Sequence, residues 1–258
     1  MDLTAHAGLT LVAETMLALG LDAAVEEVLR LRIRQRGFAE YAKLQALVLL
    51  LAAGGECVED VRVLAGDAGL TRLLGGEVPS ADALHDFLAA SHDEAALAQR
   101  PPEGAWIPAE PPALEALQAV NRYLVHRAVA ARVPRRATLD LDATIIESHK
   151  REARPHYLGG RGYQPVAVLW AEEDLVVADQ YRDGNVPAGT RMLEVAHRGF
   201  ETLPASVTDR FFRGDSACYD AALLKYLVRT EVGFTISADM TRELRQACAA
   251  PQGEWTVL

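Results

Sequence analysis

The stretch PVAVLWAEEDLVVADQY (residues 165–181) decides the fold of the second half of this chain. It holds two runs typical of β-strands, residues 165–172 and 175–181, which are separated only by Glu173 and Asp174. A gap of two residues allows an antiparallel hairpin, whereas a parallel crossover needs about a dozen residues. A third run, ATLDLDAT (residues 137–144), alternates in the same way upstream. These runs predict a sheet that begins with three antiparallel strands.

The pattern downstream of the hairpin predicts helices that alternate with strands. We expect a helix over 190–199, a strand ending near Arg213-Gly214-Asp215, a helix over 219–229, a strand over 233–238 and a final helix from Thr241. The predicted order is β-β-β-α-β-α-β-α, an α/β arrangement in which βα units follow the antiparallel strands on one mixed sheet. This order matches the ribonuclease H-like fold.

The first part of the chain has a different pattern. Apolar residues recur at helical spacing over residues 1–98, which predicts an all-α N-terminal domain. Residues 99–112 carry five of the twelve prolines without periodicity and predict a linker, and a helix over 113–131 follows. We therefore expect a helical domain over 1–98, a linker and connecting helix over 99–133, and a ribonuclease H-like domain over 134–258.

Composition limits the class of protein. The chain has 258 residues, of which 50% are hydrophobic and 24% charged, as is typical of globular proteins. Its best apolar run, residues 44–53, is about half the length that a membrane span needs. The N-terminus lacks a signal-peptide layout, and three separated cysteines predict neither disulfides nor a zinc ribbon. We expect a cytoplasmic protein with no membrane partner.

The charge of the chain gives conflicting indications about DNA. The net charge is −10, whereas proteins that bind nucleic acid are usually basic. Two local clusters of arginine oppose this average: Arg30, Arg32, Arg34 and Arg36, and then Arg132, Arg135 and Arg136. Solvated helix ends are the simpler explanation of such clusters, because cations favour helix C-termini. Charge alone therefore does not decide the function.

Aspartates near the ends of two predicted strands are the candidates for chemistry. Asp140 and Asp142 flank Leu141, so alternation places both on one face of a strand that we expect to be buried. Asp215 ends the fourth predicted strand, which lies beside the first in a ribonuclease H-like sheet. We therefore expect Asp142 and Asp215 to converge and to hold Mg²⁺ or Mn²⁺ through carboxylate oxygens. A two-ion site could activate water or a 3′-hydroxyl and stabilise the leaving oxygen at phosphorus. Asp140 is either an additional site residue or a solvent-facing acid.

Several longer motifs in a fixed order carry a family resemblance. They are LDLDATIIESHKREA (139–153), RGYQPVAVLWAE (161–172), DGNVPAG (183–189) and RGDSACYD (213–220), together with LTAHAGLTLVAE (3–14) and ALVLLLAAGGECVEDV (46–61) near the N-terminus. With these motifs the chain resembles bacterial insertion-sequence transposases, and more narrowly the DDE-domain group 1 branch, relatives of the IS4-like set. The likeness covers nearly the whole chain.

The resemblance implies an activity, a cofactor and partners. Such enzymes cut DNA at the terminal repeats of an element and join the 3′-hydroxyl to target DNA. They use two divalent ions held by an Asp-Asp-Glu triad, and they can assemble as homo-oligomers on DNA. Asp142 and Asp215 match the first two acids as catalytic and metal-binding residues. A bacterial, nucleoid-associated location is also implied.

The third acid of the triad has no clear match. In IS4-like enzymes it follows a β-rich insertion, in a Tyr-Arg-Glu-Lys helix, and the chain ends at Leu258, about where that insertion should begin. We therefore expect a truncated transposase that is incomplete at its C-terminal end. Glu243, on the helix after the fifth strand, is either a replacement for the missing acid or a solvated helix residue.

The polar segment SHKREARPH (148–156) follows the first acid motif. Its side chains His149, Lys150, Arg151 and Arg154 are candidates for contacting the DNA backbone. A solvated loop without a ligand would have the same composition. The segment is expected to be a loop in either case.

Two other functions fit parts of the sequence. A haloacid dehalogenase-type phosphatase would use Asp140-Leu141-Asp142-Ala143-Thr144 as a DxDxT motif, with Asp140 as the nucleophile and Asp142 as the acid/base. That fold needs parallel strands with crossovers, which the gap at Glu173-Asp174 excludes. The second alternative is a non-catalytic DNA-binding or assembly remnant, in which the helical leader binds and the acids are vestigial.

Overall fold

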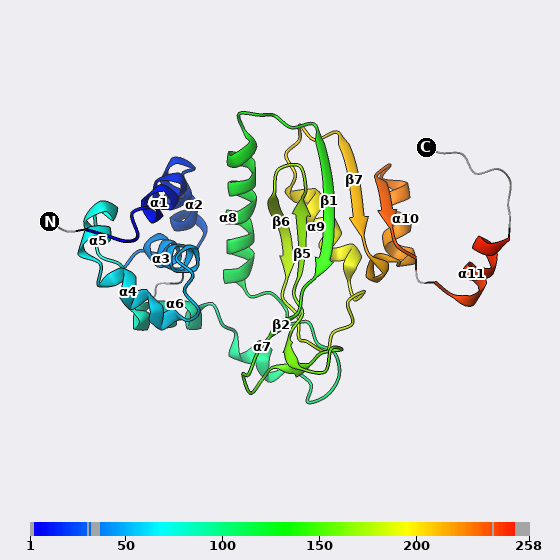
Figure 1. Cartoon of the computed structure of the whole chain (residues 1–258), viewed down its shortest axis with the longest axis horizontal. Helices are drawn as coiled ribbons and strands as arrows, with labels where there is room; N and C mark the ends of the chain where they lie inside the picture. The colour runs from blue at the N-terminus through cyan, green and yellow to red at the C-terminus, as the bar shows by residue number, and fades with distance from the viewer. Residues whose placement is uncertain (1–2, 30, 32–36, 239, 251–258) are drawn as a thin grey trace. The chain divides into compact units, whose positions relative to one another are not determined.

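A computed structural model describes residues 3–29, 31, 37–238 and 240–250, and it divides the chain into two compact units, Met1–Val133 and Pro134–Leu258 (Figure 1). The arginine cluster at Arg30, Arg32, Arg34 and Arg36 lies outside the described residues.

Helices form the regular structure of the described part of the first unit. They are α1 (Leu9–Ala18), α2 (Leu21–Val28), α3 (Glu40–Ala52), the 3₁₀ turn η1 (Val58–Asp60), α4 (Val61–Ala65), α5 (Ala68–Leu74), α6 (Ala81–Ala90), α7 (Glu94–Ala98) and α8 (Pro112–Val129). Residues 99–111 are irregular, and Pro112 begins α8, where a missing N–H costs nothing. Side-chain acceptors cap α5, α6 and α7 at Asp67, Ser80 and Asp93.

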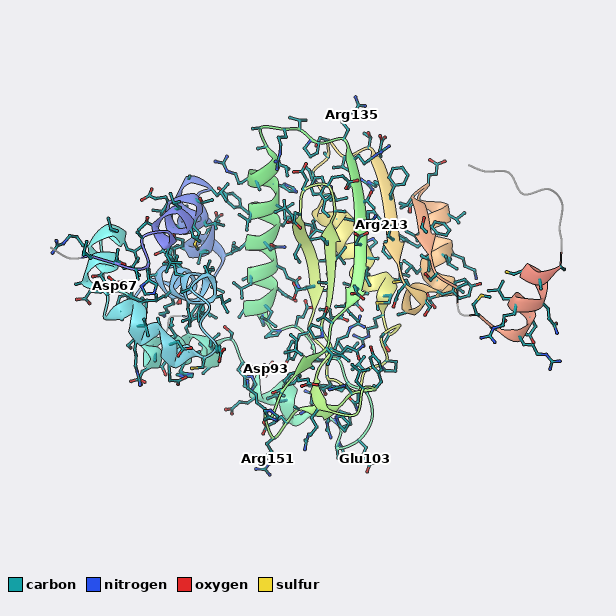
Figure 2. All side chains as sticks on the ribbon, viewed as in Figure 1. Asp67, Asp93, Glu103, Arg135, Arg151 and Arg213 are labelled. Atoms are coloured by element: carbon teal, nitrogen blue, oxygen red, sulfur yellow. The ribbon has the colours of Figure 1, made fainter. Side chains whose placement is uncertain are left out.

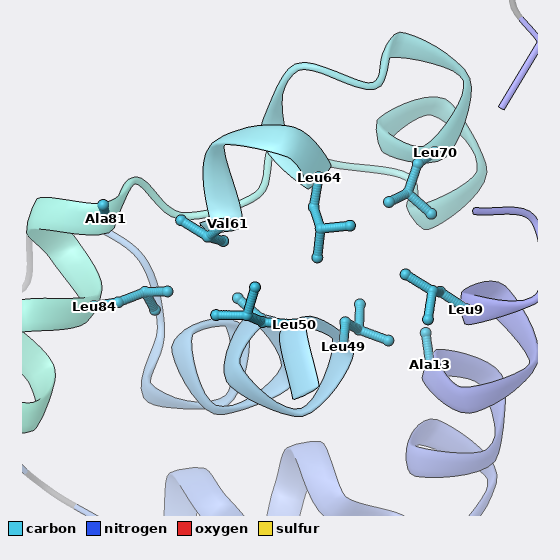
Figure 3. Close-up of a cluster of buried hydrophobic side chains, with 10 residues drawn as sticks. Leu9, Ala13, Leu49, Leu50, Val61, Leu64, Leu70, Ala81 and Leu84 are labelled. Carbon is cyan, nitrogen blue, oxygen red and sulfur yellow. The ribbon is translucent and has the colours of Figure 1, made fainter. Parts of the chain in front are cut away.

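Two groups of buried side chains hold this unit together. In the first group, leucines and small residues from α1, α3, α4, α5 and α6 point toward one another (Figure 3). The second group joins α1, α2, α6 and α8 around Val25 and Val120, and partly buried side chains of α3 pack against it. Gly20, between α1 and α2, has a φ of 75°, and a Cβ there would lie 2.8 Å from the Tyr123 hydroxyl oxygen. Glycine therefore allows both the left-handed turn and the close approach of α8.

The second unit is built on a mixed sheet (Figure 1). Within the described residues its strand order is β6-β5-β1-β7-β8. The strands are β1 (Arg136–Ala143), β5 (Val166–Trp170), β6 (Leu175–Gln180), β7 (Asp209–Gly214) and β8 (Gly233–Ile236). β1–β5 and β5–β6 are antiparallel, whereas β1–β7 and β7–β8 are parallel. The hairpin predicted at Glu173-Asp174 is confirmed by the β5–β6 pairing.

Helices cover one face of this sheet. They are α9 (Met192–Thr202) and α10 (Ala221–Arg229), and the 3₁₀ turn η2 (Ser216–Cys218) precedes α10. The last helix, α11 (Arg242–Ala249), follows β8 along the chain and has no buried residue. A Cβ added to Gly199 of α9 would lie 3.0 Å from Val168 and 3.2 Å from Leu139, so α9 packs closely on that face. Tyr226 of α10 packs edge-to-face on His197 of α9. Leu139, Val168 and other apolar side chains of this face are fully buried.

The segment at residues 148–156, predicted to be a loop, is irregular over 148–153 as expected, but Arg154 and Pro155 belong to a second, small sheet. Its strands are β2 (Ile146–Glu147), β3 (Arg154–Pro155) and β4 (Arg161–Tyr163), paired in the order β2-β4-β3. Strands of two or three residues show no detectable alternation, which is why the pattern did not reveal them. Gly162 makes the pairing possible, because a Cβ there would lie 2.2 Å from the carbonyl oxygen of Ile146.

No helix in the described part of the chain is long and apolar enough to cross a membrane.

Asp67 connects α5 to the segment before α1. Its Oδ1 accepts a hydrogen bond from the Leu70 N–H (2.9 Å), and its Oδ2 accepts one from the Thr4 hydroxyl (2.5 Å) and contacts Nδ1 of His6 at 3.0 Å. These contacts, with His6 the largest, lower the pKa of Asp67 from 3.8 to about 2. The carboxylate form is therefore the one that stabilises the first unit.

We predict that Asp67→Asn lowers the melting temperature near neutral pH. Asn keeps an oxygen for the helix cap but loses the charge. Because the pKa is depressed in the folded state, this stabilisation is complete above about pH 4 and is lost as the pH falls toward about 2. Thermal unfolding of the native chain and Asp67→Asn across this pH range should show that the difference between their melting temperatures narrows on acidification. Asp93→Asn is the control, since within the described residues the Asp93 side chain makes only the cap bond from the Ala96 N–H. A difference that does not depend on pH would contradict the prediction.

Candidate functional site

Asp142 and Asp215 lie at the same end of neighbouring strands. In the parallel pair β1–β7, Asp140 is in register with Arg213 and Leu141 with Gly214, so Asp142 and Asp215 occupy the next step. Side chains alternate along a strand, so Asp142 shares the face of Asp140, and Asp215 shares that of Arg213. The contact between Asp140 and Arg213 shows that this is one face. Because adjacent strands are about 4.8 Å apart, the two acids are neighbours.

This face is open, contrary to the expectation of a buried strand. Asp142 and Asp215 are exposed and Asp140 is partly exposed, whereas Leu139 and Leu141 are buried on the opposite face. The helices α9 and α10 cover the leucine face, which leaves the carboxylates accessible. The site can therefore receive a ligand from solvent.

Each of the two acids makes one local hydrogen bond. Oδ1 of Asp142 accepts from the Ala143 N–H at 2.8 Å, and Oδ1 of Asp215 accepts from the Ala217 N–H at 2.9 Å, which begins η2. Among the described residues, neither carboxylate has a cationic side chain as an ion-pair partner. Two neighbouring negative charges are thus left without a compensating cation.

Cys218 gives a second indication that the two acids converge. Its thiol is fully buried, and its pKa is raised to about 12, first by burial and then by the negative charges of Asp215 and Asp142. Both carboxylates therefore lie near the same sulfur. Gly214 packs directly against it, because a Cβ at Gly214 would lie 2.6 Å from Sγ. The thiol therefore packs inside the unit, next to the segment that carries Asp215.

Asp140 is engaged by an arginine that the sequence analysis did not single out. Nε and Nη2 of Arg213 donate to the two carboxylate oxygens of Asp140, each at 2.5 Å. This bidentate pairing raises the pKa of Arg213, chiefly through the hydrogen bonds to Asp140. The register of β1 against β7 produces the pair, and register cannot be read from either strand alone.

The loop at residues 183–189 contains the motif DGNVPAG and lies against the same site. A Cβ at Gly189 would lie 2.9 Å from the carbonyl oxygen of Ala217, two residues after Asp215. The Gly184 N–H donates to Gly162 of the small sheet at 3.1 Å, and Asp183 forms a β-bridge with Tyr163. The loop therefore connects the small sheet to the segment that carries Asp215.

Arg182, just before this loop, is a buried cation that the sequence analysis missed. Its side chain is 0% exposed; Nε donates to Gln180 at 2.8 Å and Nη1 to the Ala188 carbonyl at 3.2 Å. Nη2 has no partner among the described residues. Burial, the largest cause, lowers its pKa to about 10. The sequence places Arg182 directly before a turn motif, but the burial of its side chain could not be inferred from that position.

The residues expected to contact DNA lie on or beside the small sheet. His149, Lys150 and Arg151 are exposed in the connection between β2 and β3, and Arg154 is partly buried in β3. Figure 2 shows the Arg151 side chain directed away from the ribbon at the end of this sheet. Arg161 braces the connection, since its guanidinium donates to the carbonyls of Ala153 and Arg151 at 2.9 and 3.0 Å.

The structure does not bring Glu243 into a three-ligand site. Glu243 lies in the first turn of α11, which Thr241 caps through the Leu244 N–H. Across the described ranges, no three His, Cys, Asp or Glu side chains are grouped closely enough to hold one metal ion. Asp142 and Asp215 therefore form a pair, and the role of Glu243 stays a prediction.

Comparison with protein families gives a match over residues 1–255, to the family described as transposase DDE domain group 1. No curated protein matches the chain. One similar solved structure is piggyBac transposase in a synaptic complex with hairpin DNA, with a TM-score of 0.45 and 12% identity over 93% of this chain and 54% of that one.

Two further solved structures contain Mos1 transposase. One is a paired-end complex with the left transposon end, and the other is a pre-cleavage transpososome. Each has a TM-score of 0.27 and 13% identity, and each alignment covers 79% of this chain. The alignments cover 60% of the transposase chain in the paired-end complex and 61% of that in the pre-cleavage transpososome. The chain thus spans less than two thirds of the length of these solved transposases.

We predict that Gly214→Ala destabilises the second unit. The new Cβ would meet Cys218 Sγ at 2.6 Å and Cys218 Cβ at 2.7 Å, so η2 and the Asp215 carboxylate must shift. Overpacking of this kind costs about 1–3 kcal/mol, which urea unfolding can measure. Gly76→Ala is the matched control, because nothing lies within 4 Å of a Cβ there. If the two variants were equally stable, η2 would have moved to accommodate the new Cβ without loss of stability, and the prediction would be wrong.

Proposed function

Because the chain belongs to the family of transposases with a DDE domain of group 1, we propose that it is a DNA transposase. The reaction would be cleavage of DNA at the ends of an element and transfer of the 3′-hydroxyl to a target. One observation carries this proposal: Asp142 and Asp215 share one open face at the ends of adjacent parallel strands. The partner would be DNA, both the terminal repeats and the target.

We assign the sheet of the second unit to the ribonuclease H-like class. In the main sheet, β1, β5 and β6 are the first three strands along the chain, and neighbouring strands among these three run antiparallel. The next two strands, β7 and β8, run parallel to β1, and β7 lies beside it. This topology supports the assignment independently of the family match. It also requires Asp142 and Asp215 to come from segments 73 residues apart in the sequence.

The family generally uses divalent metal ions, and the donor set at this site fits a hard cation. Two exposed carboxylates, for which the described part of the chain supplies no cationic partner, offer oxygen ligands of the kind that Mg²⁺ and Mn²⁺ prefer. Asp142 and Asp215 would hold the metal, and water and DNA phosphate would complete the coordination. When bound, a pair of such ions supplies activation of the attacking oxygen and stabilisation of the leaving oxygen.

The two Asp side chains would be positioned by their own backbone contacts. The bonds from Ala143 and Ala217 fix Oδ1 of each acid and orient its second oxygen. Asp140, on the same face, would stay outside the metal site because Arg213 engages both of its oxygens. Glu243 would join the site only if α11 approached the pair.

The alternatives are less well supported by the geometry. A haloacid dehalogenase-type phosphatase would need Asp140 as a free nucleophile, whereas this carboxylate is paired with Arg213. The antiparallel pairs β1–β5 and β5–β6 also differ from the parallel sheet of that fold. A non-catalytic remnant would keep this fold but would not respond to divalent ions, which makes it distinguishable by titration.

We predict that Mg²⁺ or Mn²⁺ raises the melting temperature of the native chain. At an ion concentration about 100 times Kd, linkage stabilises the folded state by about 2.7 kcal/mol. Asp142→Asn and Asp215→Asn should lose this response, because each removes a ligand charge while keeping the oxygen that accepts the local N–H. Both should be at least as stable as the native chain without ions, since the repulsion between the acids is relieved.

The same variants test catalysis. In Mn²⁺, the native chain should nick supercoiled plasmid DNA, and Asp142→Asn and Asp215→Asn should not. Asp140→Asn is the matched control, because it lies two residues away on the same face and is already paired. An ion response that persists in Asp142→Asn would refute the assignment of that ligand. A native chain with neither an ion response nor nicking would favour the remnant.

We also predict that the exposed cations of the small sheet bind the DNA backbone. Lys150→Ala and Arg151→Ala should each weaken binding to any DNA sequence and reduce the slope of log affinity against log salt by about 1. Fluorescence anisotropy with a labelled duplex at several salt concentrations measures both effects. Lys225→Ala in α10 is a control for loss of one positive charge elsewhere in the same unit. Unchanged salt slopes would place the DNA contact on another surface.

A further inference from the structure

The turn between β3 and β4 presents two large apolar side chains to solvent. Tyr157 is 77% exposed and Leu158 is 69% exposed. The backbone around them is well held: the His156 N–H donates to the Gly160 carbonyl, and the Gly159 N–H donates to the His156 carbonyl, each at 3.0 Å. The two side chains are therefore presented by an ordered turn.

The side chain of His156 packs against the backbone of this turn. Its ring is buried, and its Nδ1 accepts a hydrogen bond from the Leu158 N–H at 3.3 Å. A Cβ at Gly160 would lie 2.7 Å from Nε2, so the chain passes directly over the imidazole. The histidine thus fixes the direction in which Tyr157 and Leu158 leave the backbone.

The surroundings of this apolar tip are positively charged. Residues 144–163 contain four Lys or Arg against two Glu, within a chain whose net charge is −10. In the described part of the chain, the side chains of Lys150 and Arg151 make no ion pair or hydrogen bond. A partner that has both negative charge and flat apolar surface would satisfy the cations and the tip together. A nucleic acid with an unpaired base has both properties.

The tip is also connected to the acids. β2 begins at Ile146, four residues after Asp142, and the small sheet is bonded to loop 183–189, which abuts η2 after Asp215. The small sheet is therefore joined to both segments that carry the acids.

We propose that Tyr157 and Leu158 form a contact site for an unpaired base at a DNA end, while Lys150 and Arg151 hold the adjacent phosphates. This inference rests on the proposed function and specifies the form of DNA that the site prefers. The tyrosine ring would stack on the base, and the leucine would cover the base pair exposed behind it. Stacking of this kind does not depend on sequence, because every base has a π-face.

The test uses the full chain and two fluorescein-labelled duplexes, one fully paired and one with its terminal base pairs mismatched. The native chain should bind the mismatched end about tenfold more tightly. Tyr157→Ser should lose this preference while keeping its affinity for the paired duplex, and Leu158→Ser should reduce it. Tyr157→Phe should retain it, because the ring remains. Leu51→Ser, at a leucine that is 73% exposed on α3, is the matched control.

Each outcome bears on a specific claim. Equal affinity of the native chain for both duplexes, or a preference that survives in Tyr157→Ser, would overturn this inference while leaving ion-dependent nicking as support for the proposed function. Loss of the preference in Tyr157→Ser but not in Tyr157→Phe would support it. If the native chain bound neither duplex, the inference would fail and so would the proposed function. Thermal unfolding verifies that each variant is folded.

Discussion

The parallel pairing of β1 with β7 is the constraint on which the rest of this structure depends. It brings together two segments that are 73 residues apart, and its register sets which side chains meet. Asp140 meets Arg213, and one step further the acids Asp142 and Asp215 come together. A slip of one residue would turn the acids to opposite faces, because side chains alternate with a period of two. The buried face, on which α9 packs against Leu139 and Val168, opposes such a slip.

The site is held by a continuous set of contacts around this pair of strands. Gly162 and Gly184 let the small sheet and loop 183–189 approach closely, and Gly189 and Gly214 do the same around η2. Arg182 anchors the loop from inside the unit through the Ala188 carbonyl. Glycines recur because the backbone itself forms these contacts. The charged groups thus sit on a close-packed support, while the face that they share stays open.

The strands of the main sheet could be predicted because alternation and a two-residue gap are strong local signals. The proximity of Asp142 to Asp215 could be predicted from the order of the strands and helices. The small sheet could not, since β2, β3 and β4 are too short for periodicity and depend on the contact of Gly162 with Ile146. The pairing of Asp140 and the burial of Arg182 depend on register and tertiary packing. The roles of Asp142, Asp215 and the basic residues stay predictions.

The small sheet occupies an insertion point in the main sheet. The chain leaves the main sheet after Ala143, forms the small sheet and returns to the main sheet at Val166. Ala143 and Val166 are partners in the β1–β5 ladder. Exposed loop tips are where polypeptides accept insertion or exchange of residues most readily. The exposed turns of the small sheet could therefore diverge in length or sequence, provided that Gly162 and the bridge from Tyr163 to Asp183, which connect this sheet to the loop beside η2, are kept. Grafting this segment between related chains would be a practical way to transfer whatever selectivity it confers.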